Sequence, residues 1–181
     1  MRNRLGLTYP LFAKNSFAIP ALVLLMAGSL TACTTDGGAS NAPNGKASTS
    51  SSTALPVVSG AQGEPPTIAA PTGSAPTSLQ LQDIYLGSGA EAKATSTLTV
   101  HYTLMAWSTG KVVESSWTSN SPATFPLSQV ILGWQQGIPG MKVGGRRLLV
   151  IPPALGYGDQ AAGPIAANET LIFVVDLLGV N

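Results

Sequence analysis

The side chains that could carry chemistry in this sequence are mostly aromatic. They share a ring or a carboxylate placed among apolar neighbours, and they are Tyr102, Glu114, Trp134, Tyr157 and Phe173. Such a set is typical of an apolar pocket in which a ligand is held by ring contacts and a few hydrogen bonds. The chemistry that fits it needs neither a nucleophile nor a metal.

Residues for covalent or metal chemistry are scarce. The one histidine, His101, lies inside a strand pattern and is expected to be structural. Ser115-Ser116 has no obvious base beside it, as nucleophilic catalysis would require. Metal sites need clusters of His, Cys and carboxylates, and the sequence has no such cluster. We therefore expect no metal and no cofactor.

Charge argues against nucleic acid as a partner. Charged residues make up only 9% of the chain, and the longest basic run is the pair Arg146-Arg147, which is expected at a solvated strand edge. Three of the nine basic residues lie within the first fourteen positions. From residue 33 onward six basic and eight acidic residues remain, a net charge of −2. This balance would not attract an anionic polymer.

A short turn around Trp134 is the element that would place the pocket. Ile131, Trp134 and Ile138 lie at i, i+3 and i+7, which predicts little more than one helical turn with one apolar side. Gly137 and Pro139-Gly140 end it. One side of so short a helix cannot support an indole, so we expect strands to wrap around this turn and enclose the ring in a shallow apolar pocket.

The remaining pattern between residues 78 and 181 is mostly strand. Residues 98–105 alternate with period two, which predicts a strand with one buried face. Residues 111–116 and 146–151 form two further short runs. Residues 170–180 are apolar on both faces, as expected of a strand in the middle of a sheet. About 104 residues are enough for a domain that folds alone.

The first 33 residues are predicted to be an export signal. A basic start precedes an apolar stretch, residues 17–30, that is shorter than the roughly 20 residues a membrane-spanning helix needs. Leu30-Thr31-Ala32-Cys33 resembles the bacterial lipoprotein processing box, which implies lipidation of Cys33 and attachment to a membrane through that lipid. A plain cleavable signal that happens to contain Cys33 is the alternative.

Residues 34–77 are predicted to be a disordered linker. They are dominated by Ser, Thr, Ala, Gly and Pro, and no aromatic residue lies between Phe17 and Tyr85. Such a segment cannot bury enough apolar surface to offset its chain entropy. Our expected domain boundaries are therefore 1–33, 34–77 and 78–181.

Short motifs across residues 78–181 resemble FKBP-type peptidyl-prolyl cis–trans isomerases. In the family's order and with near-matching spacing, they are Val100-His101-Tyr102-Thr103, Gly133-Trp134, Gly137, Met141-Lys142-Val143-Gly144-Gly145, Ile151-Pro152-Pro153, Tyr157-Gly158 and Thr170-Leu171-Ile172-Phe173. Single pieces are weak signals, whereas the ordered set is specific. The resemblance implies an α+β, mostly β fold, in which an antiparallel half-barrel sheet of five to six strands wraps around one short helix.

The resemblance also implies roles for individual residues. Trp134 would be the floor on which a proline ring sits, with Tyr102 and Phe173 as walls. The Ile131 backbone N–H would donate to a substrate carbonyl, and Tyr157 would hydrogen-bond the substrate from the loop side. The expected catalytic residues are Tyr102, Glu114, Tyr157 and Phe173, and the expected substrate-binding residues are Val113, Phe125, Val130, Ile131, Trp134 and Ile165.

One departure from the family pattern falls inside the site. The family usually has Phe-Asp where this chain has Val113-Glu114. Val113 supplies a smaller wall than an aromatic ring would, and Glu114 keeps the carboxylate on a side chain longer by one methylene.

The function implied is a monomeric peptidyl-prolyl isomerase at the cell envelope, facing outside the cytoplasm. It would accelerate rotation about X–Pro bonds in exported polypeptides and be inhibited by macrolides of the rapamycin or tacrolimus type. Two alternatives stay open. The first is a non-catalytic FKBP-like binding module or chaperone for proline-containing segments, which Val113 and Glu114 favour. The second is a purely structural envelope lipoprotein.

Overall fold

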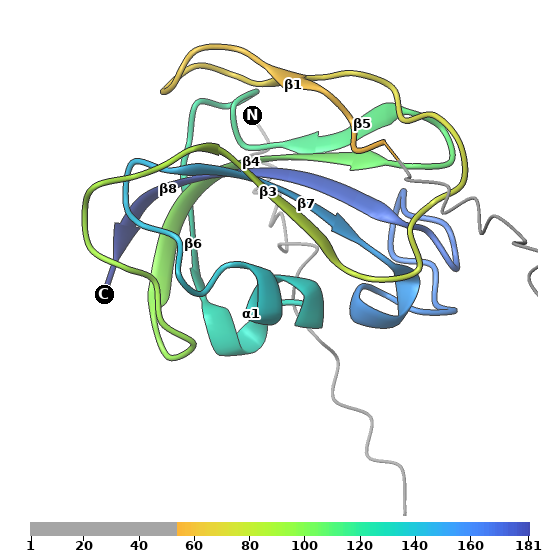
Figure 1. Ribbon diagram of the computed structural model, residues 1–181. Helices are drawn as coiled ribbons and strands as arrows, with labels where there is room; N and C mark the ends of the chain where they lie inside the picture. The colour runs from red at the N-terminus through yellow and green to blue at the C-terminus, as the bar shows by residue number, and fades with distance from the viewer. Residues whose placement is uncertain (1–53) are drawn as a thin grey trace, which may run out of the picture. The chain divides into compact units, whose positions relative to one another are not determined.

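Six antiparallel strands form the sheet that carries the candidate site. The computed structural model describes residues 54–181, and its sheet strands are β3 (Gln80–Tyr85), β4 (Thr97–Ala106), β5 (Lys111–Ser115), β6 (Ala123–Pro126), β7 (Arg146–Ile151) and β8 (Leu171–Val180). Their order is β3-β7-β8-β4-β5, with β6 also paired to β4. One short helix, α1 (Leu132–Gly137), packs beneath this sheet (Figure 1). The predicted half-barrel fold is confirmed.

Two turns of 3-10 helix complete the helix side of the sheet. They are η1 (Leu127–Gln129), which leads into α1, and η2 (Pro153–Leu155), which follows β7. Within residues 54–181 no helix has both the length and the apolar character needed to cross a bilayer.

Strand β8 lies in the middle of the sheet, between β7 and β4, as its pattern predicted. Its residues from Leu171 to Leu177 are all buried. On the helix side, Phe173, Val175 and Leu177 join the large core that surrounds α1. On the other side, Ile172 and Val174 join a second, smaller core. Both faces of the sheet are therefore covered.

The prediction of a single buried face for β4 was wrong. His101, Thr103 and Met105, which alternate with the residues facing the helix, are also buried. Alternation in the sequence reports which residues differ in polarity, but it does not reveal a second layer that covers the polar face.

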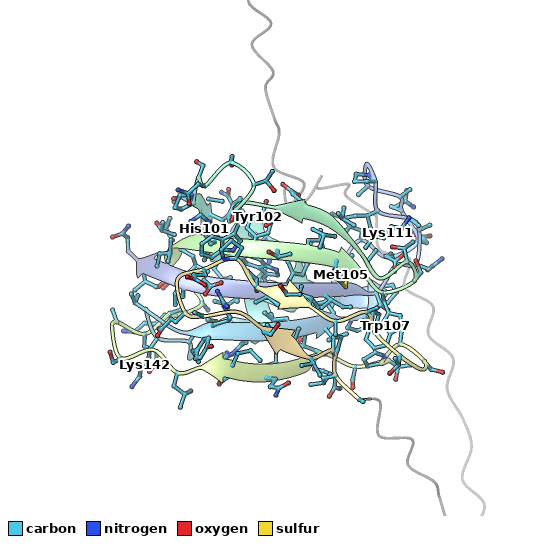
Figure 2. All side chains as sticks on the ribbon, turned by 90° about the horizontal axis from the view of Figure 1, so that it is seen from above. His101, Tyr102, Met105, Trp107, Lys111 and Lys142 are labelled. Atoms are coloured by element: carbon cyan, nitrogen blue, oxygen red, sulfur yellow. The ribbon has the colours of Figure 1, made fainter. Side chains whose placement is uncertain are left out.

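That second layer is the segment 54–77, which we call the strap. The strap contains β1 (Val58–Ser59) and β2 (Thr67–Ile68), paired antiparallel with Val58 opposite Ile68. It crosses the face of the sheet opposite α1 (Figures 1 and 2). The predicted disordered linker is therefore wrong for residues 54–77, because a few apolar side chains, Ile68 above all, find a complementary apolar surface on the sheet. Residues 1–53, with the predicted signal and Cys33, lie outside the described residues.

Arg146 also corrects a prediction. We expected Arg146-Arg147 at a solvated strand edge, yet β7 lies between β3 and β8, inside the sheet. Arg146 has an exposed fraction of 0%, whereas Arg147 is partly exposed and pairs with Asp83 of β3, its Nε 2.6 Å from the carboxylate. Neighbouring residues of a strand point to opposite faces, so the two arginines meet different surroundings.

Candidate active site

Two glycines of α1 allow Trp134 to reach the centre of the sheet. A Cβ atom at Gly133 would lie 2.4 Å from Ile151 Cγ2, and one at Gly137 would lie 2.7 Å from Leu149 Cδ2. Any side chain at these positions would push α1 away from β7. The close approach places the Trp134 indole against the strands, where its exposed fraction is 0%.

Three further rings surround the indole edge-on. The centroid of Trp134 lies 5.4 Å from that of Phe173, 6.2 Å from that of Tyr102 and 6.2 Å from that of Phe125, with interplanar angles of 87°, 81° and 90°. Edge-to-face contacts of this kind are favourable because the ring edge is positive and the face negative. The rings come from β4, β6, α1 and β8, so the structure brings together the predicted floor, the two predicted walls and the predicted substrate-binding residue Phe125.

Val130 and Ile131 form the segment that leads into α1, and both are buried. The Gln135 side chain folds back, its Nε2 donating to the Val130 carbonyl at 2.7 Å. Ile131 is the helix N-cap; its carbonyl accepts from the Trp134 amide, whereas no hydrogen bond within residues 54–181 uses its N–H. The resemblance implied that this N–H donates to a substrate carbonyl, and that role remains a prediction. Nothing in the sequence pattern identified the supporting role of Gln135.

Glu114 is hydrogen-bonded to Tyr102. The Tyr102 hydroxyl donates to Glu114 Oε1 at 2.7 Å. A register shift between Leu104 and Met105, where β4 pairs with β5, accompanies the approach of the longer glutamate side chain. Burial, and then the hydrogen bond to Glu114, raise the pKa of Tyr102 far above its usual range, so the hydroxyl stays a donor at every physiological pH. Glu114 Oε2 is buried and has no hydrogen-bond partner among the described residues.

Tyr157 and Ile165 lie on the loop after η2. The Gly158 amide donates to Pro153 O and the Asn168 amide to Gly158 O, both at 2.8 Å, which closes the base of the loop. Ile165 is buried in the core around α1, and Tyr157 is half-buried against it. Burial, and then the charge of Glu114, raise the pKa of Tyr157 to about 12. Tyr157 is thus a neutral hydroxyl on the same side of the cluster as Glu114.

Val113 completes the set. It is half-buried and packs against the core that contains Trp134. All ten predicted site residues within the described range therefore contribute to, or lie beside, one apolar cluster; the lipidation residue Cys33 lies outside that range. Their catalytic and binding roles remain predictions.

The sequence analysis missed two further residues that support this site. The Ser116 hydroxyl accepts from the Tyr102 amide at 2.9 Å, and the Glu169 carboxylate accepts from the Ser108 amide at 3.0 Å and from its hydroxyl at 2.6 Å. Glu169 ties the end of the Tyr157 loop to the turn after β4. A polar residue near a glycine-rich loop is too common a pattern to have revealed this.

A family model described as "FKBP-type peptidyl-prolyl cis-trans isomerase" matches residues 89–178. A probable FK506-binding protein of Corynebacterium glutamicum is 46% identical over 115 residues, which cover 64% of this chain and 98% of that protein. The chain belongs to the FKBP-type peptidyl-prolyl isomerase family. An FK506-binding protein of Streptomyces anulatus is 50% identical over 121 residues, covering 65% of this chain and 98% of the relative.

Solved FKBP structures agree with the fold. FkpA from Escherichia coli superposes with a TM-score of 0.55 at 39% identity, covering 58% of this chain and 49% of that one. AtFKBP13 superposes with a TM-score of 0.53 at 36% identity, covering 59% and 96%. The match to the FKBP family model begins at residue 89, so the strap lies outside it.

Proposed function

We propose that this FKBP domain catalyses cis–trans isomerisation of X–Pro peptide bonds at the aromatic cluster around Trp134. The observation that carries the proposal is the enclosure of one indole by three edge-on rings, next to a free N–H at Ile131 and the hydroxyl–carboxylate pair of Tyr102 and Glu114. A proline ring would contact the edge of this buried cluster, and the polar groups would contact the adjoining backbone.

The reaction requires rotation about an amide bond. The barrier arises from amide resonance and is about 18–20 kcal/mol. In the twisted amide the nitrogen and carbonyl are no longer conjugated, so charge separation is smaller than in the planar form. A dry apolar site therefore favours the twisted form relative to water, and catalysis is its selective binding. No proton transfer or covalent intermediate is needed.

The polar groups would fix the substrate backbone. The Ile131 N–H would donate to a carbonyl beside the proline, and the Tyr157 hydroxyl would donate to another from the loop side. Glu114 would hold the Tyr102 hydroxyl, and its unpaired Oε2 could accept a backbone N–H of the substrate. Each contact restricts the chain on either side of the rotating bond.

The direct test is an NMR exchange assay on a short X–Pro peptide, with and without rapamycin. We expect turnover that the macrolide abolishes; the relatives named as FK506-binding proteins support a macrolide as the ligand, and FK506 serves as a second inhibitor. Macrolide binding without turnover would instead select the non-catalytic binding module or chaperone. Failure of both would support a purely structural protein.

We further propose that the protein is exported and lipid-anchored through Cys33, with its isomerase domain facing outside the cytoplasm and acting as a monomer on exported polypeptides. The support is the sequence Leu30-Thr31-Ala32-Cys33 at the end of an apolar, basic-headed segment. Labelled palmitate should enter the wild-type protein and not the Cys33→Ser variant, which should leave the membrane fraction. Equal labelling of the two proteins would overturn the anchor.

A further inference from the structure

The strap is held to the outer face of the sheet by an apolar layer. Ile68 is buried in a cluster with residues of three strands, namely Met105, Leu148, Val150, Ile172 and Val174, and partly buried Leu55, Val58, Ile84 and Trp107 surround it. Figure 2 looks down on this face and shows the strap lying over the strands, with Met105 on β4 and Trp107 directly after it. Burying this layer is the main apolar gain from docking the strap.

Arg146 also holds the strap to the sheet, through a set of hydrogen bonds that we call the latch. Its Nη1 lies 3.4 Å from the carbonyl oxygen of Gly60 and 3.2 Å from that of Ala61, and its Nη2 donates to Glu64 O at 2.6 Å. The Tyr85 hydroxyl donates to Gly60 O at 2.9 Å, and the guanidinium carbon lies 5.7 Å from the Tyr85 ring centroid. A buried guanidinium needs acceptors for its N–H groups, and these three carbonyl oxygens of the strap supply them.

The latch continues into the sheet. Arg146 Nε donates to Asp176 Oδ1 at 2.7 Å, and Asp176 is the register partner of Arg146 on β7 and of His101 on β4. The His101 ring stacks on Trp117 at 3.9 Å, and its Nδ1 lies 2.9 Å from the Ser116 hydroxyl oxygen. Asp176 and His101 are thus cross-strand neighbours on the outer face, with no hydrogen bond between their side chains among residues 54–181.

Ser116 completes the path to the pocket. Its hydroxyl accepts from the Tyr102 amide at 2.9 Å, and the Ser116 amide donates to the Tyr102 carbonyl at 3.1 Å. These bonds fix the backbone of the residue whose ring faces Trp134 and whose hydroxyl holds Glu114. The outer-face contacts of Ser116 therefore fix the backbone of Tyr102, whose ring is a predicted wall of the pocket.

We propose that the strap is a docked control element of this isomerase: it is seated by Ile68 and Arg146, and its docking positions Tyr102 through Asp176, His101 and Ser116. The effect on turnover rests on the proposed function, whereas docking and the link to Tyr102 do not. In this arrangement any force or partner that lifts the strap from the sheet lowers isomerase activity without touching the pocket.

The test compares Ile68→Asp with Val57→Asp in the full chain. Ile68 is buried between the strap and the sheet, whereas Val57 has an exposed fraction of 70%, so only the first aspartate must leave the apolar layer for water. In Ile68→Asp we expect hydrogen exchange of the Ala69 amide, which is bonded to Val57 O, to accelerate about tenfold or more. We expect the same variant to lose about threefold or more in kcat, with a smaller change in KM.

NMR of the amides of Tyr102 and Ser116 gives a readout independent of turnover. Both should shift in Ile68→Asp and stay unchanged in Val57→Asp. If Ala69 stays protected in Ile68→Asp, the seating is wrong; if the strap undocks while these amides and kcat keep their wild-type values, the coupling is wrong. A wild-type chain without turnover would instead refute the proposed function and leave the exchange and NMR comparisons as the test of the strap.

Discussion

The two faces of the sheet bury polar groups in different ways. On the inner face the Ile131 N–H and Glu114 Oε2 have no hydrogen-bond partner within residues 54–181, although they lie beside a dry aromatic cluster. On the outer face every nitrogen of the Arg146 guanidinium is satisfied by Asp176 or by the strap, whereas Asp176 Oδ2 is buried without a hydrogen-bond partner within residues 54–181. Because unpaired buried groups cost free energy, the Ile131 N–H and Glu114 Oε2 suit a ligand that can pair them, whereas Asp176 Oδ2 is a cost that the outer face keeps. The Arg146 donors of the outer face are already paired with carbonyl oxygens of the strap.

The largest effect that would break this comparison is expected from Trp134→Ala. Removing the indole should lower kcat/KM at least about tenfold through lost ring contacts, and it should reduce the free energy of unfolding by about 3–5 kcal/mol. A protease-coupled or NMR exchange assay measures the first quantity and urea denaturation the second. Trp134→Phe keeps a ring and should lose less of both. Full activity in a folded Trp134→Ala protein would refute the assigned floor.

Next in size is Arg146→Met, which tests the outer face. Loss of the Arg146 guanidinium leaves Asp176 buried without its partner, so the free energy of unfolding should fall by about 3–5 kcal/mol. Burial already raises the pKa of Asp176, and the Arg146 guanidinium opposes that rise.

Arg147→Met is the matched control. The pair of Arg147 with Asp83 is partly exposed to solvent, and Arg147 Nη1 also donates to Gly137 O at 2.7 Å, so the variant should lose about 1–2 kcal/mol. Denaturant titration measures the free energy of unfolding of both variants. Equal losses would contradict the distinction between the buried pair of Arg146 and the partly exposed pair of Arg147.

A smaller effect is expected from Val113→Phe, which sharpens the inner face. The half-buried valine leaves a smaller wall than an aromatic ring, and filling it should raise kcat/KM about twofold to threefold through added contact with substrate. Val112→Phe, on the exposed side of the same strand, is the control. An unchanged or lower value for Val113→Phe would remove Val113 from the pocket wall.

The smallest effect is on pH dependence. Since the pKa of Tyr157 is raised to about 12 from an ordinary value of 10.0, the folded protein holds this proton more tightly than the unfolded chain. Stability from this residue is therefore complete below pH 10 and declines as pH rises toward 12. Tyrosinate absorbance combined with urea unfolding should show a shallower decline for Tyr157→Phe. The same slope in both proteins would mean that Tyr157 is not held in an apolar site.

The inner face could be predicted from the sequence because its determinants are local and periodic. The spacing of Ile131, Trp134 and Ile138 gave the helical turn, and the doubly apolar run at residues 170–180 gave the central strand. The ordered motifs then placed the aromatic residues of the family pocket. Gly133 and Gly137 fitted this reading because only a missing side chain lets α1 touch β7.

The outer face was decided by the tertiary structure. A Ser, Thr, Gly and Pro-rich segment buries little surface alone, so its composition predicted disorder; it is ordered at residues 54–77 because distant strands supply an apolar layer for Ile68 and a guanidinium for its carbonyls. Arg146 and Arg147 are indistinguishable as sequence neighbours, yet strand geometry directs one into a sealed network and the other toward Asp83. The sequence alone determined which residues could form the pocket, whereas long-range contacts determined what covers the sheet behind it, because burial depends on partners far away along the chain.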